Sequence, residues 1–175
     1  MSKNIEYEIK ILDVNTNALH KKLVSLGFNQ VPRFMFKRRV YELGKDTWIR
    51  LRTNGKKTTL TYKKSNADKI DGMEEIEIEV SDFEATNNIL TNAGLIAKNY
   101  QENYRTEFSN NEIEVTIDEW PLIKPYVEIE GSSVEKVKQY IKSLGLDKHE
   151  MTSKPTSYVY EIAGIDLDSI DDLVF

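Results

Sequence analysis

The chain has 175 residues, of which 39% are hydrophobic and 30% charged, and it carries a net charge of −5 at pH 7. This composition is typical of a soluble globular domain, and the negative charge argues against a general DNA- or RNA-binding surface. The absence of cysteine excludes disulfides, thiolate metal sites and cysteine nucleophiles. Because neither a stretch of roughly 20 apolar residues nor a signal peptide is visible, we expect a cytoplasmic protein with no membrane partner.

Segments in which charged and apolar residues alternate recur along the chain. The first runs from Ile5 to Ile11, and as a strand it places Glu6, Glu8 and Lys10 on one face. The same pattern predicts further strands at residues 34–43, 48–53, 58–64, 74–80, 100–108, 112–120 and 126–130. Asn54-Gly55 predicts a hairpin turn, and a polar loop is expected at residues 65–72.

Three amphipathic helices are predicted between these strands. Their expected N-caps are Asp13, Ser81 and Ser132, and their expected ends are Gly27, Gly94 and Gly145. Because the three helices end alike, we interpret the chain as repeated strand-to-helix units within a single domain of residues 1–175. The segment after Glu150 has no clear assignment.

The charged faces of the strands are segregated by sign. Arg50, Arg52 and Lys63 lie on some strands, and carboxylate pairs lie on others. The opposite faces are rich in Ile, Val and Leu and need helices to cover them. The charges either coat an open sheet or line the interior of a closed one. The segregation favours the second arrangement, so we predict an α+β fold in which helices surround a closed antiparallel β-barrel with a charged interior.

Such an interior brings many like charges together. Its carboxylates are Glu6, Glu8, Glu75, Glu77, Glu79, Glu114, Asp118, Glu128 and Glu130, and its cations are Lys10, Arg50, Arg52, Lys63, Arg105 and Lys154. Two like charges about 4 Å apart repel by roughly 4 kcal/mol at an effective dielectric near 20. Clustered carboxylates therefore take up protons, pair with cations or bind metal. Oxygen ligands alone suit Mg²⁺ or Mn²⁺, and arginines suit phosphate oxygens, so the pattern predicts a site for a metal-bound polyphosphate.

These residues resemble the CYTH superfamily of triphosphate tunnel metalloenzymes. Glu6-Tyr7-Glu8-Ile9-Lys10 matches its Glu-x-Glu-x-Lys signature. The match continues in order through Arg50-x-Arg52, Lys63, Glu75-x-Glu77, Arg105, Asp118, Glu128-x-Glu130 and Lys154 followed by Tyr158. The resemblance implies an eight-stranded antiparallel tunnel that binds a triphosphate and two divalent ions. The chain departs from the family at Val40-Tyr41-Glu42-Leu43, where the family usually has Tyr-(Phe/Tyr)-Asp-Thr.

The resemblance also implies roles for individual residues. Phosphate oxygens would be bound by Lys10, Arg50, Arg52, Lys63, Arg105 and Lys154. Metal would be held by Glu6, Glu8, Asp118, Glu128 and Glu130, with help from Glu75 and Glu77. Residues expected to act in catalysis are Tyr41, Lys63, Glu128 and Glu130.

Three functions are compatible with these residues. We predict metal-dependent hydrolysis of a triphosphate, because it needs only the tunnel. A class IV type adenylyl cyclase, converting ATP to cyclic AMP and pyrophosphate, would also need an adenine pocket. The candidate residues for it are Phe34, Phe36, Trp48 and Trp120, although such aromatics are more often packing residues. The third is a polyphosphate-binding module without catalysis. The expected partner is a small-molecule triphosphate, DNA is not expected, and a homodimer is left open.

Overall fold

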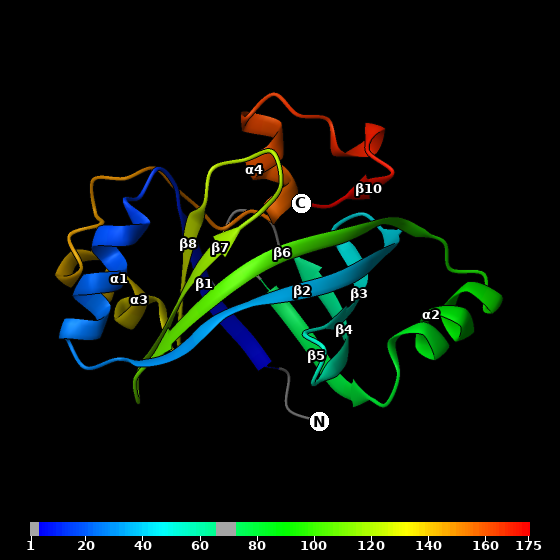
Figure 1. The fold of residues 1–175 in the computed structure, drawn as a ribbon, viewed down its shortest axis with the longest axis horizontal. Coiled ribbons are helices and arrows are strands. Elements are labelled where there is room, and N and C mark those ends of the chain that lie inside the picture. The colour runs from blue at the N-terminus through cyan, green and yellow to red at the C-terminus, as the bar shows by residue number, and fades with distance from the viewer. Residues whose placement is uncertain (1–3, 66–72) are drawn as a thin grey trace.

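The computed structural model describes residues 4–65 and 73–175, so most of the loop expected at residues 65–72 lies outside the described residues. The elements in chain order are β1 (Asn4–Ile11), α1 (Thr16–Ser25), β2 (Asn29–Gly44), β3 (Thr47–Thr53), β4 (Thr58–Ser65), β5 (Met73–Val80), α2 (Phe83–Asn92), β6 (Ala97–Ser109), β7 (Ile113–Glu119), β8 (Tyr126–Gly131), α3 (Val134–Ser143), β9 (Met151–Thr152), α4 (Thr156–Ile162), the 3-10 turn η1 (Leu167–Ser169) and β10 (Asp172–Leu173). Figure 1 shows the strands as one strongly curled sheet.

The sheet is antiparallel apart from its last strand. Its order is β10-β6-β2-β3-β4-β5-β1-β8-β7, and β9 pairs with β1. Only the short pairing of β10 with β6 is parallel. The strand β6 also pairs with β7 over Tyr104 to Ser109. Register shifts between β2 and β6 near Val31 and Arg39 mark irregularities of the kind that increase local twist and bend a sheet. The predicted antiparallel sheet is thus confirmed as a curled sheet.

Strand alternation directs apolar side chains to the outer face of β1, β7 and β8. There Ile9 and Ile11 of β1 join Leu23 of α1 and Val137 of α3 in one buried cluster. The side chains between them in the strand, Glu8 and Lys10, therefore point to the inner face. Figure 1 shows α1 and α3 together on this side of the sheet.

The predicted surround of helices is incomplete on the other side of the sheet. The helix α2 packs near β3 and buries none of its side chains. On β5, Ile76 and Ile78 remain 49% and 55% exposed. The expectation that helices cover every apolar strand face is therefore wrong for β5, because α1 and α3 both join the buried cluster on the outer face of β1, β7 and β8.

The C-terminal segment forms a second, smaller core. Leu12 and Trp120 pack there against Val159, Tyr160 and Leu173. The Tyr160 hydroxyl donates to the backbone oxygen of Pro121 at 2.8 Å, which fixes α4 across one end of the sheet (Figure 1).

The helices begin slightly later than the sequence predicts. The N-caps are Asn15, Asp82 and Ser133, whose side chains accept hydrogen bonds from the backbone N–H groups of Ala18, Ala85 and Lys136. A side chain in this position satisfies an otherwise unpaired helix N–H. The hairpin at Asn54-Gly55 is confirmed, with the Asn54 amide oxygen accepting from the N–H groups of Lys56 and Lys57. Among the described residues, no helix combines the length and apolarity needed to cross a bilayer.

A charged cavity as candidate functional site

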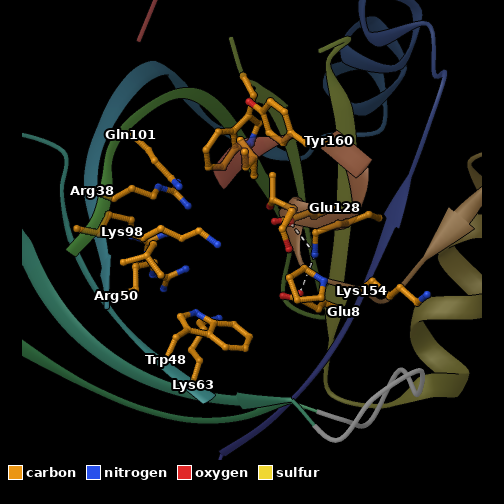
Figure 2. A pocket seen from close by; sticks show the side chains of 18 of the residues that line it. Glu8, Arg38, Trp48, Arg50, Lys63, Lys98, Gln101, Glu128, Lys154 and Tyr160 are labelled. Carbon is orange, nitrogen blue, oxygen red and sulfur yellow. Dashed lines mark hydrogen bonds and ion pairs between the residues drawn. The ribbon is translucent and has the colours of Figure 1, made fainter. Parts of the chain in front are cut away.

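The inner face of the curled sheet borders a cavity of about 850 Å³. Most of the site residues expected from the sequence meet there. The structure places at its wall Glu8, Lys10, Arg50, Arg52, Lys63, Glu75, Glu77, Arg105, Glu128, Glu130 and Lys154. Figure 2 shows Arg38, Lys98 and Arg50 entering from one wall, and Glu8 and Glu128 together with Lys154 on the opposite one.

Glu128 lies at the centre of an ion network on the carboxylate wall. Its carboxylate is 3.2 Å from the Lys10 ammonium and 2.7 Å from the Arg105 guanidinium. Burial alone would raise the pKa of Glu128, but Lys10 and Arg105 outweigh it and hold that pKa well below its ordinary value. Burial lowers the pKa of Lys10, but Glu8 and Glu128 outweigh it and raise that pKa. These groups therefore remain charged at neutral pH.

Asp118 supports this network from behind the wall. It is fully buried, and both of its oxygens accept hydrogen bonds from Arg105, at 2.9 and 2.7 Å. Asn103 and Thr116 donate to it at 2.8 and 3.0 Å. The structure does not bring Asp118 to the cavity surface, where a metal ligand was expected. Asp118 instead holds Arg105 in position, because Arg105 of β6 and Asp118 of β7 are direct partners in the sheet.

The opposite wall carries a group of cations with long ion pairs. The Arg50 guanidinium is 3.5 Å from Glu75 and 3.6 Å from Glu77, and Arg52 reaches Glu77 only at 4.0 Å. Lys63 is closer, at 2.7 Å from Glu75. Burial and the neighbouring arginines, Arg50 foremost, lower the pKa of Arg52 well below its ordinary value. Positive charge on this wall is therefore incompletely neutralised, and an anion entering the cavity would relieve it.

A row of carboxylates crosses three strands on the other wall. Glu8 of β1 pairs in register with Glu130 of β8, and Glu130 pairs with Glu114 of β7. Burial, followed by repulsion from Glu8 and Glu114, raises the pKa of Glu130 to about 7. Within the described ranges, no three carboxylate or histidine side chains stand close enough together to hold a metal ion. The donor set is nevertheless made of oxygen alone, which suits Mg²⁺ or Mn²⁺, and a divalent ion would remove the repulsion that the raised pKa reports.

A second predicted residue, Tyr41, does not lie at the cavity. Tyr41 points away from the cavity, because its neighbours Val40 and Glu42 line it and strand alternation turns Tyr41 to the outer face. Its hydroxyl donates instead to Asn87 of α2 at 2.8 Å, so the structure does not bring Tyr41 to the site. The backbone of Glu6 lies in β1, but its side chain lies outside the described residues. Lys154 is at the edge of the cavity, with its ammonium 4.2 Å from the ring centre of Tyr158.

Other lining residues were missed by the sequence reasoning. Arg38, Gln101 and Tyr160 line the cavity together with Leu167 and Leu173 of the C-terminal segment. In the run Lys37-Arg38-Arg39 every residue is basic, so alternation alone does not tell which one faces inward. The C-terminal residues have no periodic pattern, and no signal in the sequence places them at the cavity.

The fold and the site together define a class of protein, in which a curled antiparallel sheet surrounds an interior of acidic and basic side chains. The chain belongs to the CYTH domain family, which matches residues 4–159. The family predicted from the sequence is therefore confirmed. No curated protein matches the sequence.

Solved structures share the same fold. A conserved hypothetical protein from Pyrococcus furiosus is 22% identical, with a TM-score of 0.73 over 83% of this chain and 94% of its own. A candidate adenylate cyclase from Bacillus halodurans is 19% identical, with a TM-score of 0.64 over 91% and 99%. A candidate adenylyl cyclase from Hippeastrum, described as having a dominant triphosphatase activity, is 16% identical, with a TM-score of 0.59 over 93% and 97%. At these identities the likeness establishes the fold, and both activities occur among the descriptions of these neighbours.

Proposed function

We propose that this protein is a divalent-metal-dependent phosphohydrolase that acts on a triphosphate, inorganic or organic, bound inside the sheet. The observation that carries the proposal is the opposition of two charged walls across one cavity. Arg50, Arg52 and Lys63 line one side, and Glu8 and Glu130 line the other. A phosphate chain bearing metal ions has the complementary charges for both walls.

The proposal includes closure of the sheet into an eight-stranded tunnel. Support comes from the strand pairing, because β6 pairs with β2 on one side and with β7 on the other. The remaining pairings run from β2 through β3, β4, β5, β1 and β8 to β7. A closed sheet excludes bulk water from its interior and strengthens electrostatic interactions there.

The residues of this chain then have distinct tasks. Lys10, Arg50, Arg52, Lys63 and Arg105 bind phosphate oxygens, and the guanidinium groups do so with two parallel N–H donors. Glu8 and Glu130 are the described carboxylates best placed to hold divalent ions, since Glu128 is already engaged by Lys10 and Arg105. When bound, the ions would neutralise charge on the phosphates and provide an activated water. In hydrolysis the water oxygen bonds to the terminal phosphorus while the bridging P–O bond breaks, and diphosphate leaves.

The second candidate is the adenylyl cyclase. The cavity of about 850 Å³ is within the range of roughly 300–1,000 Å³ of small-molecule sites and exceeds what a bare triphosphate needs. Trp48 lines it and offers an aromatic ring for a base, whereas the Trp120 ring already lies under the Arg38 guanidinium. The third candidate, a module that binds polyphosphate without turnover, keeps the same cations.

The purified protein should be given tripolyphosphate, thiamine triphosphate and ATP separately, each with Mg²⁺ or Mn²⁺. Release of orthophosphate supports the hydrolase, and release of pyrophosphate with cyclic AMP supports the cyclase. Tight binding without turnover under either metal supports the binding module. The double variant Glu128→Gln with Glu130→Gln should abolish turnover. Glu79→Gln is the matched control, because Glu79 is on β5 and its side chain is 65% exposed.

A further inference from the structure

Arg38 is a buried arginine of the cavity wall that the sequence match to the family does not assign. It lies on β2, paired with Arg52 of β3 and Gln101 of β6, lines the cavity and is only 8% exposed. Figure 2 shows its side chain entering the cavity beside Lys98 and Arg50, facing Glu128 on the opposite wall.

The contacts of Arg38 orient its guanidinium without neutralising it. One terminal nitrogen donates to the Asn103 side-chain oxygen, and Asn103 is itself fixed by a hydrogen bond to Asp118. The guanidinium carbon lies over the Trp120 ring, 4.4 Å from its centre. A contact with an aromatic ring positions the guanidinium without using its N–H donors.

No carboxylate among the described residues forms an ion pair with Arg38, and its Nε–H, although buried, has no hydrogen-bond partner. Burial, with repulsion from Arg50 and Arg105, outweighs the attraction of Asp118 and lowers the pKa of Arg38 to about 9. A buried cation without a directly paired counter-charge costs free energy. Asn103 and Trp120 nevertheless position it at the cavity wall, which is the arrangement expected of a group whose counter-charge arrives with a ligand.

We propose that Arg38 is a further substrate-binding residue, whose guanidinium binds a phosphate oxygen at the end of the cavity bordered by Trp120 and Tyr160. The inference rests on the proposed function, because the ligand is a segment of the same phosphate chain. It adds a contact on β2 to those on β1, β3, β4 and β6. The ligand class is an oxyanion of a polyphosphate, since only a multiply charged chain engages Arg38 and Arg50 together.

The test compares Arg38→Gln with Arg39→Gln. Arg39 is the adjacent residue of β2, and strand alternation turns it to the outer face, where its guanidinium lies 5.5 Å from the Tyr100 ring. Binding of tripolyphosphate is measured by titration calorimetry in the presence of EDTA, so that no turnover occurs. Losing a charge-assisted hydrogen bond in a desolvated site should weaken binding by about 10- to 100-fold in Arg38→Gln. Arg39→Gln should bind within about 2-fold of the wild type, because its charge lies behind the sheet.

A second variant separates binding from folding. Arg38→Lys keeps the charge but loses the planar fork, so it should bind between the wild type and Arg38→Gln. Without ligand, the melting temperature of Arg38→Gln should not fall below that of the Asn103→Ala variant. Adding tripolyphosphate should raise the melting temperature of Arg38→Gln less than it raises that of the wild type. If Arg38→Gln binds tripolyphosphate as tightly as the wild type, the inference is overturned, but the proposed hydrolase function is not. Failure of the wild-type protein to bind any polyphosphate, both in EDTA and with added Mg²⁺ or Mn²⁺, overturns the proposed function and the inference with it.

Discussion

Asp118→Asn is expected to destabilise the protein far more than the same change at the next residue, Glu119. Both carboxylates hold an arginine with two hydrogen bonds: Asp118 holds Arg105 at 2.9 and 2.7 Å, and Glu119 holds Arg33 at 2.8 and 3.1 Å. The difference is burial. Asp118 and Arg105 are 0% and 15% exposed, whereas Glu119 and Arg33 are 31% and 47% exposed.

The size of the effect follows from what Asp118→Asn leaves behind. The amide loses one acceptor oxygen and directs an N–H₂ group toward Arg105, and also toward Asn103 or Thr116, depending on its orientation. Breaking a buried ion pair costs about 3–5 kcal/mol, most of it from the uncompensated partner. Because Arg105 keeps Glu128 at 2.7 Å, we expect the lower end, about 3 kcal/mol. For a chain of this size that loss corresponds to a fall in melting temperature of about 6–12 °C.

The assay is equilibrium unfolding in urea, followed by circular dichroism, for both variants and the wild type. Glu119→Gln should lose less than about 1 kcal/mol, because exposed ion pairs contribute little. If Asp118→Asn lost no more free energy of unfolding than Glu119→Gln, the account of Asp118 as the support of Arg105 would be refuted.

The remaining predictions concern pH, one hydroxyl and metal. In metal-free protein the pKa of Glu130 is about 7, above its value in the unfolded chain. The folded state therefore binds the extra proton, and stability should fall as the pH rises from about 4.5 to 7. In urea unfolding at pH 5 and pH 8, Glu130→Gln should lose this pH dependence of stability, and a dependence equal to that of the wild type would contradict the prediction. Tyr41→Phe should leave turnover unchanged and cost about 1 kcal/mol of stability, because only the bond to Asn87 is lost; a large fall in kcat would return Tyr41 to the site. Chelation by EDTA should abolish phosphate release and added Mg²⁺ or Mn²⁺ should restore it, whereas turnover that persists in EDTA would exclude a metal requirement.

The strands with simple alternation could be assigned to the correct face from the sequence. In β1, Ile9 and Ile11 pack under the helices while Glu8 and Lys10 line the cavity, as period-two alternation requires. The same reasoning failed in β2. There Lys37, Arg38 and Arg39 are all basic, so their inward or outward direction depends on which neighbours the sheet and α2 supply.

Long-range contacts account for the other differences. Asp118 carries the predicted charge, but its complete burial depends on Asn103 and Thr116, which have no charge pattern of their own. The C-terminal segment reaches the cavity because β10 pairs with β6 at Tyr100 and Gln101. A pairing of two residues across such a separation in the chain has no local periodicity from which it could be predicted.

The central claim is that the opposed charged walls bind a phosphate chain together with divalent ions. The most direct measurement is a crystal structure of the protein with tripolyphosphate and Mn²⁺, with the ions located by anomalous scattering. The account predicts a phosphate chain within about 2.7–3.2 Å of the donors of Arg50, Arg52 and Lys63, and manganese bound by Glu8 and Glu130. A phosphate chain bound on the outer surface, or manganese without a carboxylate ligand from the cavity, would contradict it.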